Sequence, residues 1–149
     1  MTHLLTLFGI SFVGSVFWVM NAEMAAVYYA GELGYSPALV GSICASGQTM
    51  MYILLYYGGG WLATRWRWLR RKVERVRQKY GKKLETRYLY LSFLAGIFGV
   101  PPVLAMAVLA PGFGVRGPSF FGVLFAGRTI RFTLLAWMGK PLLDSIQLI

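Results

Sequence analysis

The sequence has few of the residues on which most enzyme active sites depend. Its 149 residues include one cysteine, one histidine and five acidic side chains. A single cysteine can form neither an internal disulfide nor a thiolate metal cluster. The chain also lacks a Gly-x-x-x-x-Gly-Lys-Ser or Thr phosphate loop and any credible Ser, His and Asp set. We therefore expect no enzymatic activity, no bound metal and no cofactor.

Apolar residues, by contrast, are abundant. The chain is 57% hydrophobic and 16% aromatic, and it contains 18 glycines. This composition is typical of a polytopic integral membrane protein. The N-terminal stretch "MTHLLTLFGISF" has no basic segment and no small-residue cleavage pattern, so we expect it to stay as part of the mature chain. The predicted fold is an all-α, polytopic membrane protein with a single membrane domain over residues 1–149.

The positive charge is confined to one segment. The net charge is +10, and residues 65–87 hold 11 of the 15 lysines and arginines. We expect this basic loop to face the cytoplasm and to bind anionic lipid rather than nucleic acid. Apolar residues at spacings of three and four predict one amphipathic helix over 61–87 on the bilayer surface, with a solvated connector as the alternative. The residues assigned to the anionic-lipid surface are Arg65, Arg67, Arg70, Arg71, Lys72, Arg75 and Arg77.

Two apolar halves flank the basic connector. They are residues 1–60 and 88–140, and a tail follows at 141–149. Counted as smooth spans, they give 4–30, 37–60, 88–110 and 119–138, with both termini in the cytoplasm. Pro101 and Pro102 remove two backbone donors, and such a break survives at membrane depth only where protein or water covers it. We therefore expect two interrupted helical hairpins, at least one of them re-entrant, joined by the basic amphipathic helix.

Charged residues inside the apolar halves form the candidate site. Arg128 and Arg131 lie three residues apart in the last expected span, on one helix face. A guanidinium at mid-membrane costs about 2.5 to 3.5 kcal/mol, so each arginine needs a partner. Glu23 and Glu32 in the first half carry the opposite charge. We predict that these four residues form a substrate or charge-pair site; an ion pair that only locks the two halves together is the alternative.

Four stretches resemble a known family. They are "NAEMAAVYYAGELG", "MMYILLYYGGGWL", "GVPPVLAMAVLAPGFG" and "FAGRTIRFTLLA". Together they resemble the DedA or VTT-domain family, also called the SNARE-associated Golgi protein family, and especially its short bacterial branch. The resemblance implies two re-entrant hairpins that meet at mid-membrane in a bacterial cytoplasmic membrane. It also implies movement of phospholipid or polyprenyl-phosphate head groups, with the buried acid at Glu23 and the late arginine at Arg128 or Arg131.

Three functions remain open from the sequence. The first is a flippase-like or scramblase-like translocator in which the arginines bind an anionic head group and the acid neutralises them or carries a proton. The second is a non-catalytic subunit of a larger membrane complex, docking through its helices and the basic connector. The third is a small ion or solute carrier. The expected partners are membrane lipids, with further copies of this chain or other membrane subunits, and not nucleic acid.

Overall fold

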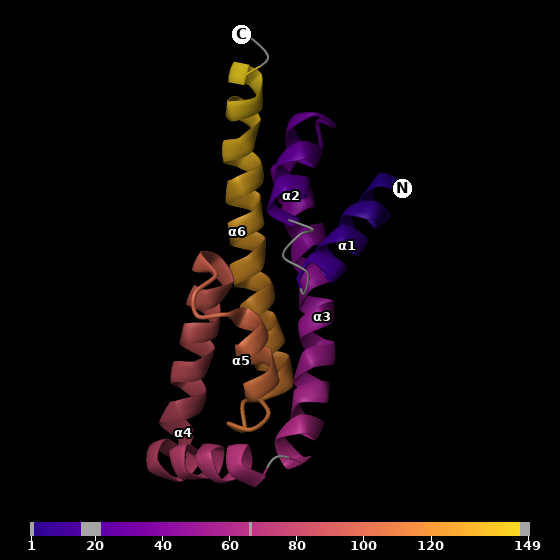
Figure 1. Ribbon diagram of the computed structural model, residues 1–149. Coiled ribbons are helices and arrows are strands. Elements are labelled where there is room, and N and C mark those ends of the chain that lie inside the picture. The colour runs from indigo at the N-terminus through magenta and orange to yellow at the C-terminus, as the bar shows by residue number, and fades with distance from the viewer. Residues whose placement is uncertain (1, 16–21, 66, 147–149) are drawn as a thin grey trace. The chain divides into compact units, whose positions relative to one another are not determined.

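The computed structural model describes residues 2–15, 22–65 and 67–146, and it is helical throughout its regular structure (Figure 1). The described part contains no strand, which confirms the predicted all-α class. Segments Pro37–Gly59 and Gly117–Gly139 are long and apolar enough to cross a membrane. The helices are α1 (Thr2–Gly14), α2 (Ala22–Gly31), α3 (Pro37–Arg65), α4 (Arg67–Phe98), α5 (Val103–Leu109) and α6 (Gly117–Ile146).

Helices α3 and α6 each follow a glycine in a left-handed conformation. Gly34 has φ +67° and precedes α3, which begins at Pro37, and Gly114 has φ +73° and precedes α6, which begins at Gly117. Side chains with a Cβ rarely adopt this conformation, whereas glycine adopts it at little cost. Each of these glycines therefore turns the chain from a short helix into a long one.

The helices form two compact units, Met1–Met51 with Phe125–Ile149 (unit 1) and Tyr52–Leu124 (unit 2). Unit 1 combines α1 and α2 with the N-terminal part of α3 and the larger, C-terminal part of α6. Unit 2 combines α4 and α5 with the C-terminal part of α3 and the start of α6. Each unit therefore contains one pair of consecutive helices and a part of each long helix.

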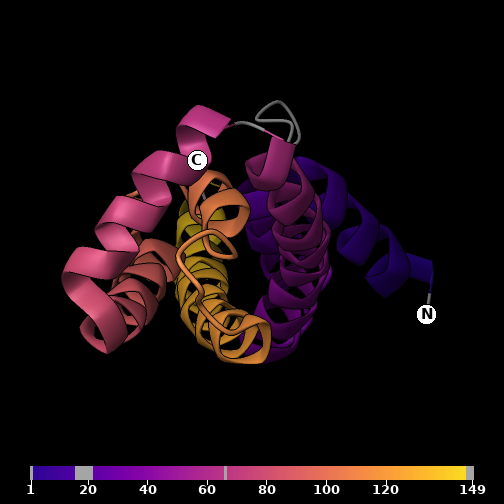
Figure 2. The ribbon, with the colours of Figure 1, turned by 90° about the horizontal axis from the view of Figure 1, so that it is seen from below.

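In unit 1, small residues allow the helices to approach closely. α1 contacts α2 and also lies against α3, as Figure 2 shows. A Cβ placed at Gly47 of α3 would lie 3.1 Å from the Cβ of Ser11 in α1. Close backbone approach at small residues is the common way in which helices pack in a membrane. The core that results contains Leu7, Ala22, Ala26, Tyr29, Ala30, Val40, Cys44, Phe132 and Ala136.

In unit 2, aromatic side chains fill the core and bond to the backbone. α4 bends, so its basic N-terminal part and its apolar C-terminal part run in different directions, and the latter pairs with α5 (Figure 1, Figure 2). The buried Tyr88 hydroxyl donates a hydrogen bond of 2.6 Å to the Met106 carbonyl oxygen of α5. A buried hydroxyl needs such a partner, so this bond fixes where α5 lies on α4.

The basic connector differs from the helix that the sequence predicts. In place of one helix over 61–87, α3 continues to Arg65 and α4 runs from Arg67 to Phe98. Lysine, arginine and leucine are good helix formers, and no proline interrupts this stretch, so α4 continues from the basic segment into the apolar one. Trp66 lies outside the described residues, as do most side chains of the expected apolar stripe. The expected boundaries at 61 and 87 are therefore wrong.

Two of the four expected spans are also not continuous helices. Over 4–30, α1 ends at Gly14 and α2 begins at Ala22. Over 88–110, α4 ends at Phe98 and α5 begins at Val103, because Pro101 and Pro102 cannot donate the backbone hydrogen bonds of a helix. The break expected at Pro101 and Pro102 is present, and the two remaining spans coincide with the long apolar segments of α3 and α6.

The two long helices carry related sequences. Residues 47–59, "GQTMMYILLYYGG", align with residues 127–139, "GRTIRFTLLAWMG", at a shift of 80 residues. The glycines that precede the two helices, Gly34 and Gly114, show the same shift and the same left-handed conformation. The chain therefore contains an internal repeat, in which α6 corresponds to α3. The identical residues are Gly47 and Gly127, Thr49 and Thr129, Leu54 and Leu134, Leu55 and Leu135, and Gly59 and Gly139.

The repeat extends to the short helices. A Cβ at Gly59 of α3 would lie 2.6 Å from the Val108 Cα of α5, and a Cβ at Gly139 of α6 would lie 2.7 Å from Val27 Cγ2 of α2. Val27 and Val108 are equivalent at a shift of 81 residues, so each unit contains a close glycine–valine approach, to the side chain of Val27 in unit 1 and to the backbone of Val108 in unit 2. The order is thus a helix pair followed by a long helix, repeated once. Further buried equivalents are Ser11 and Ser92, and Ala26 and Ala107.

We predict that Gly59→Ala destabilises the protein and that Gly58→Ala does not. An added methyl group at Gly59 would overlap the backbone of Val108, and overpacking of this kind costs about 1 to 3 kcal/mol. The neighbouring Gly58 has open space around it, so alanine there gains about 1 kcal/mol of helix propensity. Melting temperatures in detergent measure both effects. A melting temperature that rises in both variants would contradict the close contact.

Candidate functional site

An ion pair between Glu23 and Arg131 is the centre of the candidate site. Nε of Arg131 donates to Oε1 of Glu23 at 3.0 Å, and Nη2 donates to the same oxygen. The side chains are partly buried, with 22% of Arg131 and 38% of Glu23 exposed. The pairing expected between an acid of the first half and an arginine of the second is therefore present for these two residues.

Secondary structure places both partners. Glu23 lies in the first turn of α2, where the unpaired N–H groups and the helix dipole favour a negative charge. Arg131 lies inside the apolar segment Gly117–Gly139 of α6. A guanidinium there is costly unless a carboxylate compensates it, and Glu23 supplies the carboxylate. The two residues lie 108 positions apart in the sequence.

The other two expected site residues lie differently. Arg128 is one turn before Arg131 on α6 and is half-buried, so both guanidinia belong to the same side of the helix. Glu32 lies just beyond the end of α2 and is exposed. Nine residues at about 1.5 Å each separate it from Glu23 by roughly 13 Å along the helix axis. The structure therefore brings Glu23 and Arg131 together and places Glu32 away from them.

The ion pair occurs in one copy of the repeat only. At the repeat shifts of 81 and 80 residues, Glu23 corresponds to Leu104 and Arg131 corresponds to Met51. Both equivalents are apolar residues of similar length. The equivalent positions therefore carry no charge, and Leu104 packs against the apolar core of unit 2.

Two buried polar residues of α3 were not identified from the sequence. Gln48 is 6% exposed and Thr49 is 8% exposed, and among the described residues neither Gln48 Oε1 nor Thr49 Oγ1 has a hydrogen-bond partner. An unsatisfied buried polar group costs about 1 to 3 kcal/mol. The repeat was the signal that could have found them, because Gln48 and Thr49 are equivalent to Arg128 and Thr129.

The basic surface is described for only some of its residues. Arg65, Arg71 and Arg75 are exposed, and the guanidinium of Arg65 lies 5.6 Å from the centre of the Trp61 ring. Such a cation–π contact at an exposed site contributes about 0.5 to 1 kcal/mol. The side chains of the other expected lipid-binding residues, Arg67, Arg70, Lys72 and Arg77, lie outside the described part of the structure.

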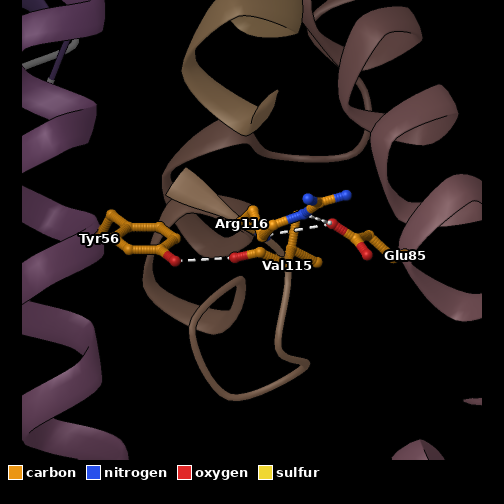
Figure 3. A network of polar contacts seen from close by, with 4 residues as sticks. All are labelled: Tyr56, Glu85, Val115 and Arg116. Carbon is orange, nitrogen blue, oxygen red and sulfur yellow. Dashed lines mark hydrogen bonds and ion pairs between the residues drawn. The ribbon is translucent and has the colours of Figure 1, made fainter. Parts of the chain in front are cut away.

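A second ion pair holds the loop before α6 in unit 2. Figure 3 shows that this loop is bonded on two sides. Tyr56 of α3 donates a hydrogen bond of 2.7 Å to the Val115 carbonyl oxygen, and Nε of Arg116 donates to Glu85 Oε1 of α4 at 3.2 Å. Hydrogen bonds from the Arg116 side chain and backbone N–H hold the pKa of Glu85 below its usual value. The pair is solvent-exposed, and we assign it a structural role.

We predict an acid-dependent loss of stability from this pair. The pKa of Glu85 is lower in the folded chain than in the unfolded chain, where it is about 4.3. The stabilisation of the fold by the ionised carboxylate is therefore complete above the unfolded pKa and is lost as the pH falls through the folded pKa. Melting temperatures of Arg116→Gln should fall less with acid than those of the unmodified chain. Glu74→Gln, on the same helix, is the control. Equal acid sensitivity in Arg116→Gln and the unmodified chain would contradict the prediction.

The donor set favours anion binding over metal binding. Among the residues that the structure describes, no group of three or more His, Cys, Asp or Glu side chains could hold a metal ion. Arginine instead offers a planar fork of N–H donors that matches a carboxylate or a phosphate. The Arg131 guanidinium holds a carboxylate in this structure, and a phosphate has the geometry to replace it.

Comparison of the chain with models of protein families, with curated proteins and with solved structures finds no match in any of the three.

Proposed function

We propose that this chain is an integral membrane protein that moves a phosphate-bearing lipid head group across the bilayer. In this proposal α3 and α6 cross the membrane, and the pairs α1–α2 and α4–α5 are re-entrant hairpins, as the resemblance to the DedA or VTT-domain family implies. The basic part of α4 lies on the cytoplasmic surface of a bacterial cytoplasmic membrane. The observation that carries the proposal is the ion pair of Glu23 and Arg131, in a unit whose core cluster is apolar.

The proposed mechanism is an exchange of anions at Arg131. Without substrate, Glu23 compensates the guanidinium and avoids the cost of a lone charge in the membrane. A lipid phosphate replaces the carboxylate and accepts two parallel hydrogen bonds from the guanidinium. Arg128, one turn away on α6, adds a second positive charge on the same side. Glu23 displaces the phosphate when the head group leaves.

The repeat supports a transport function. Many transporters consist of two related halves, with discontinuous helices that place a polar site near the middle of the membrane. This chain has the same organisation, with a helix pair and a long helix in each repeat. The exposed arginines of the connector, such as Arg71 and Arg75, would attract anionic lipid to the cytoplasmic leaflet, at about 1 kcal/mol each.

We predict that Arg131→Lys slows lipid movement about tenfold or more without lowering the melting temperature. Lysine keeps the charge and can still pair with Glu23, but it cannot form two parallel hydrogen bonds to a phosphate, and a hydrogen bond to a charged group contributes about 1.5 to 3 kcal/mol. Fluorescent lipids in reconstituted vesicles measure the movement. Arg116→Lys, at an exposed arginine outside the pair, is the matched control.

One result would contradict the proposed role of Arg131, and two others would contradict lipid translocation itself. Loss of stability with unchanged lipid movement in Arg131→Lys would assign the pair to locking the fold. An unmodified protein that moves no lipid and co-purifies with other membrane subunits at fixed stoichiometry would support the subunit of a larger complex. Ion flux across the vesicle membrane without lipid movement would support the small ion or solute carrier.

A further inference from the structure

The buried acceptors of α3 point to a second part of the proposed site. Gln48 and Thr49 are more than nine-tenths buried, yet Gln48 Oε1 and Thr49 Oγ1 have no hydrogen-bond partner among the described residues. An amide oxygen can only accept a hydrogen bond. Buried polar groups are nearly always satisfied, and exceptions call for a specific reason. Two adjacent exceptions in one apolar segment indicate a place where a bound molecule supplies donors.

Helix geometry places Gln48 at the level of the arginines. Gly41 of α3 lies directly against Thr133 of α6 in unit 1. Gln48 follows Gly41 by seven residues, two turns of helix, so it lies on the same face of α3, toward α6. Along α3 this is about 10 Å from Gly41, and Arg128 lies about 8 Å from Thr133 on α6. Since α3 and α6 run in opposite directions (Figure 1), the step from Gly41 to Gln48 and the step from Thr133 back to Arg128 point the same way. Gln48 and Arg128 therefore lie at similar depth.

The equivalent residue in the other copy of the repeat shows that Thr49 is not an ordinary helical threonine. Thr129, the equivalent of Thr49, donates its hydroxyl to the Phe125 carbonyl oxygen at 2.8 Å, as a threonine in an apolar helix usually does. Thr49 occupies the same position of the repeat but has no such bond among the described residues. The difference between the two threonines lies in their hydrogen bonds and not in their place in the fold.

We propose, on the basis of the proposed translocation, that Gln48 and Thr49 bind the hydrogen-bond donors of the transported head group as it passes along α3, in a step separate from the binding of its phosphate at Arg131. The substrate is then a phospholipid whose head group carries hydroxyl or ammonium donors, such as a phosphoglycerol or a phosphoethanolamine lipid. A phosphocholine head group has no donor to offer, and a polyprenyl phosphate has none beyond the phosphate itself. The site therefore selects among phosphate-bearing lipids by their donors.

The test compares head groups on one lipid backbone. The intact protein is reconstituted in vesicles with phosphoglycerol, phosphoethanolamine or phosphocholine lipids that carry the same fluorescent acyl chain. Each net hydrogen bond changes binding about two- to tenfold, so the choline lipid should move at least several-fold more slowly than the other two. Short-chain lipids with the same three head groups, added in detergent, should raise the melting temperature in the same order. This second readout reports binding without transport.

Two variants assign the preference to the proposed residues. Gln48→Leu and Thr49→Val remove the acceptors while keeping similar volume, and each should reduce the preference for donor-bearing head groups. Neither should lower the melting temperature without lipid, because each removes a buried oxygen that has no hydrogen-bond partner among the described residues. Thr129→Val is the matched control at the equivalent position and should keep the preference. Thr49→Val, the nearer isostere, remains informative if Gln48→Leu does not fold.

The outcomes separate this inference from the proposed function. Movement of all three head groups at equal rates overturns the donor-binding site and leaves the translocator in place. Selective thermal stabilisation by the donor-bearing lipids, with no movement of any lipid, overturns the translocator and supports the site. Neither movement nor selective stabilisation overturns both. A preference that persists in Gln48→Leu and Thr49→Val overturns the assignment to these residues.

Discussion

Glu23→Gln should lower the free energy of unfolding by about 2 kcal/mol and abolish lipid movement. The amide cannot compensate the charge of Arg131, which stays in an apolar unit without its carboxylate. Breaking a buried pair from one side costs about 3 to 5 kcal/mol and breaking an exposed pair costs less than about 1 kcal/mol. The partial burial of both side chains places this pair between the two limits.

A double-mutant cycle with Arg131→Gln measures the coupling directly. Each single variant already breaks this ion pair, so the second substitution should cost less than the first. Melting temperatures and lipid movement are both read for the four proteins. Glu32→Gln, at an exposed acid beyond the end of α2, is the comparison and should leave the coupling between Glu23 and Arg131 unchanged. Strictly additive effects of the two substitutions would show that the residues do not act as a pair.

The combined variant Glu23→Leu with Arg131→Met should fold stably and move no lipid. It copies the residues that the other repeat carries at the equivalent positions, Leu104 and Met51. Replacing a buried ion pair by apolar residues of similar size is often neutral or stabilising, by about 1 to 4 kcal/mol, because it removes the desolvation cost of both charges. The melting temperature should therefore equal or exceed that of the unmodified protein.

This variant separates folding from function more sharply than any single substitution. Glu23→Leu alone is the comparison, since it leaves Arg131 without its carboxylate and should melt at a lower temperature. If the combined variant still moves lipid at the original rate, the ion pair is not the substrate site. If it loses both stability and lipid movement, the pair contributes mainly to holding α2 on α6, and the structural alternative is favoured.

Several features followed from local sequence alone. The apolar composition predicted the all-α class, and the long apolar runs predicted the helical segments Pro37–Gly59 and Gly117–Gly139. The break at Pro101 and Pro102 was predictable because proline cannot donate the helical hydrogen bond. The boundaries of the connector were not predictable in this way. Basic residues before residue 88 and leucine and alanine after it all favour helix, so nothing local ends the helix there.

The candidate site followed from the sequence in part. The cost of a charge in an apolar helix required a partner for each arginine, and only the few acids of the first half were available. Which acid pairs with which arginine was not determined, because the choice depends on where α2 packs on α6, across 108 residues of chain. Packing selects Glu23, in the first turn of α2, and leaves Glu32 exposed beyond the helix end.

The sequence by itself determined the all-α class, the apolar segments of α3 and α6 and the charges inside apolar stretches, because these depend on properties of neighbouring residues. Only the tertiary structure decided that Glu23 meets Arg131 and that Gln48 and Thr49 are buried with oxygens that find no hydrogen-bond partner in the described part of the chain. Burial and pairing arise when helices distant in sequence approach closely, as at Gly41 and Thr133. Such contacts depend on the fit of whole helix faces, which no local pattern specifies.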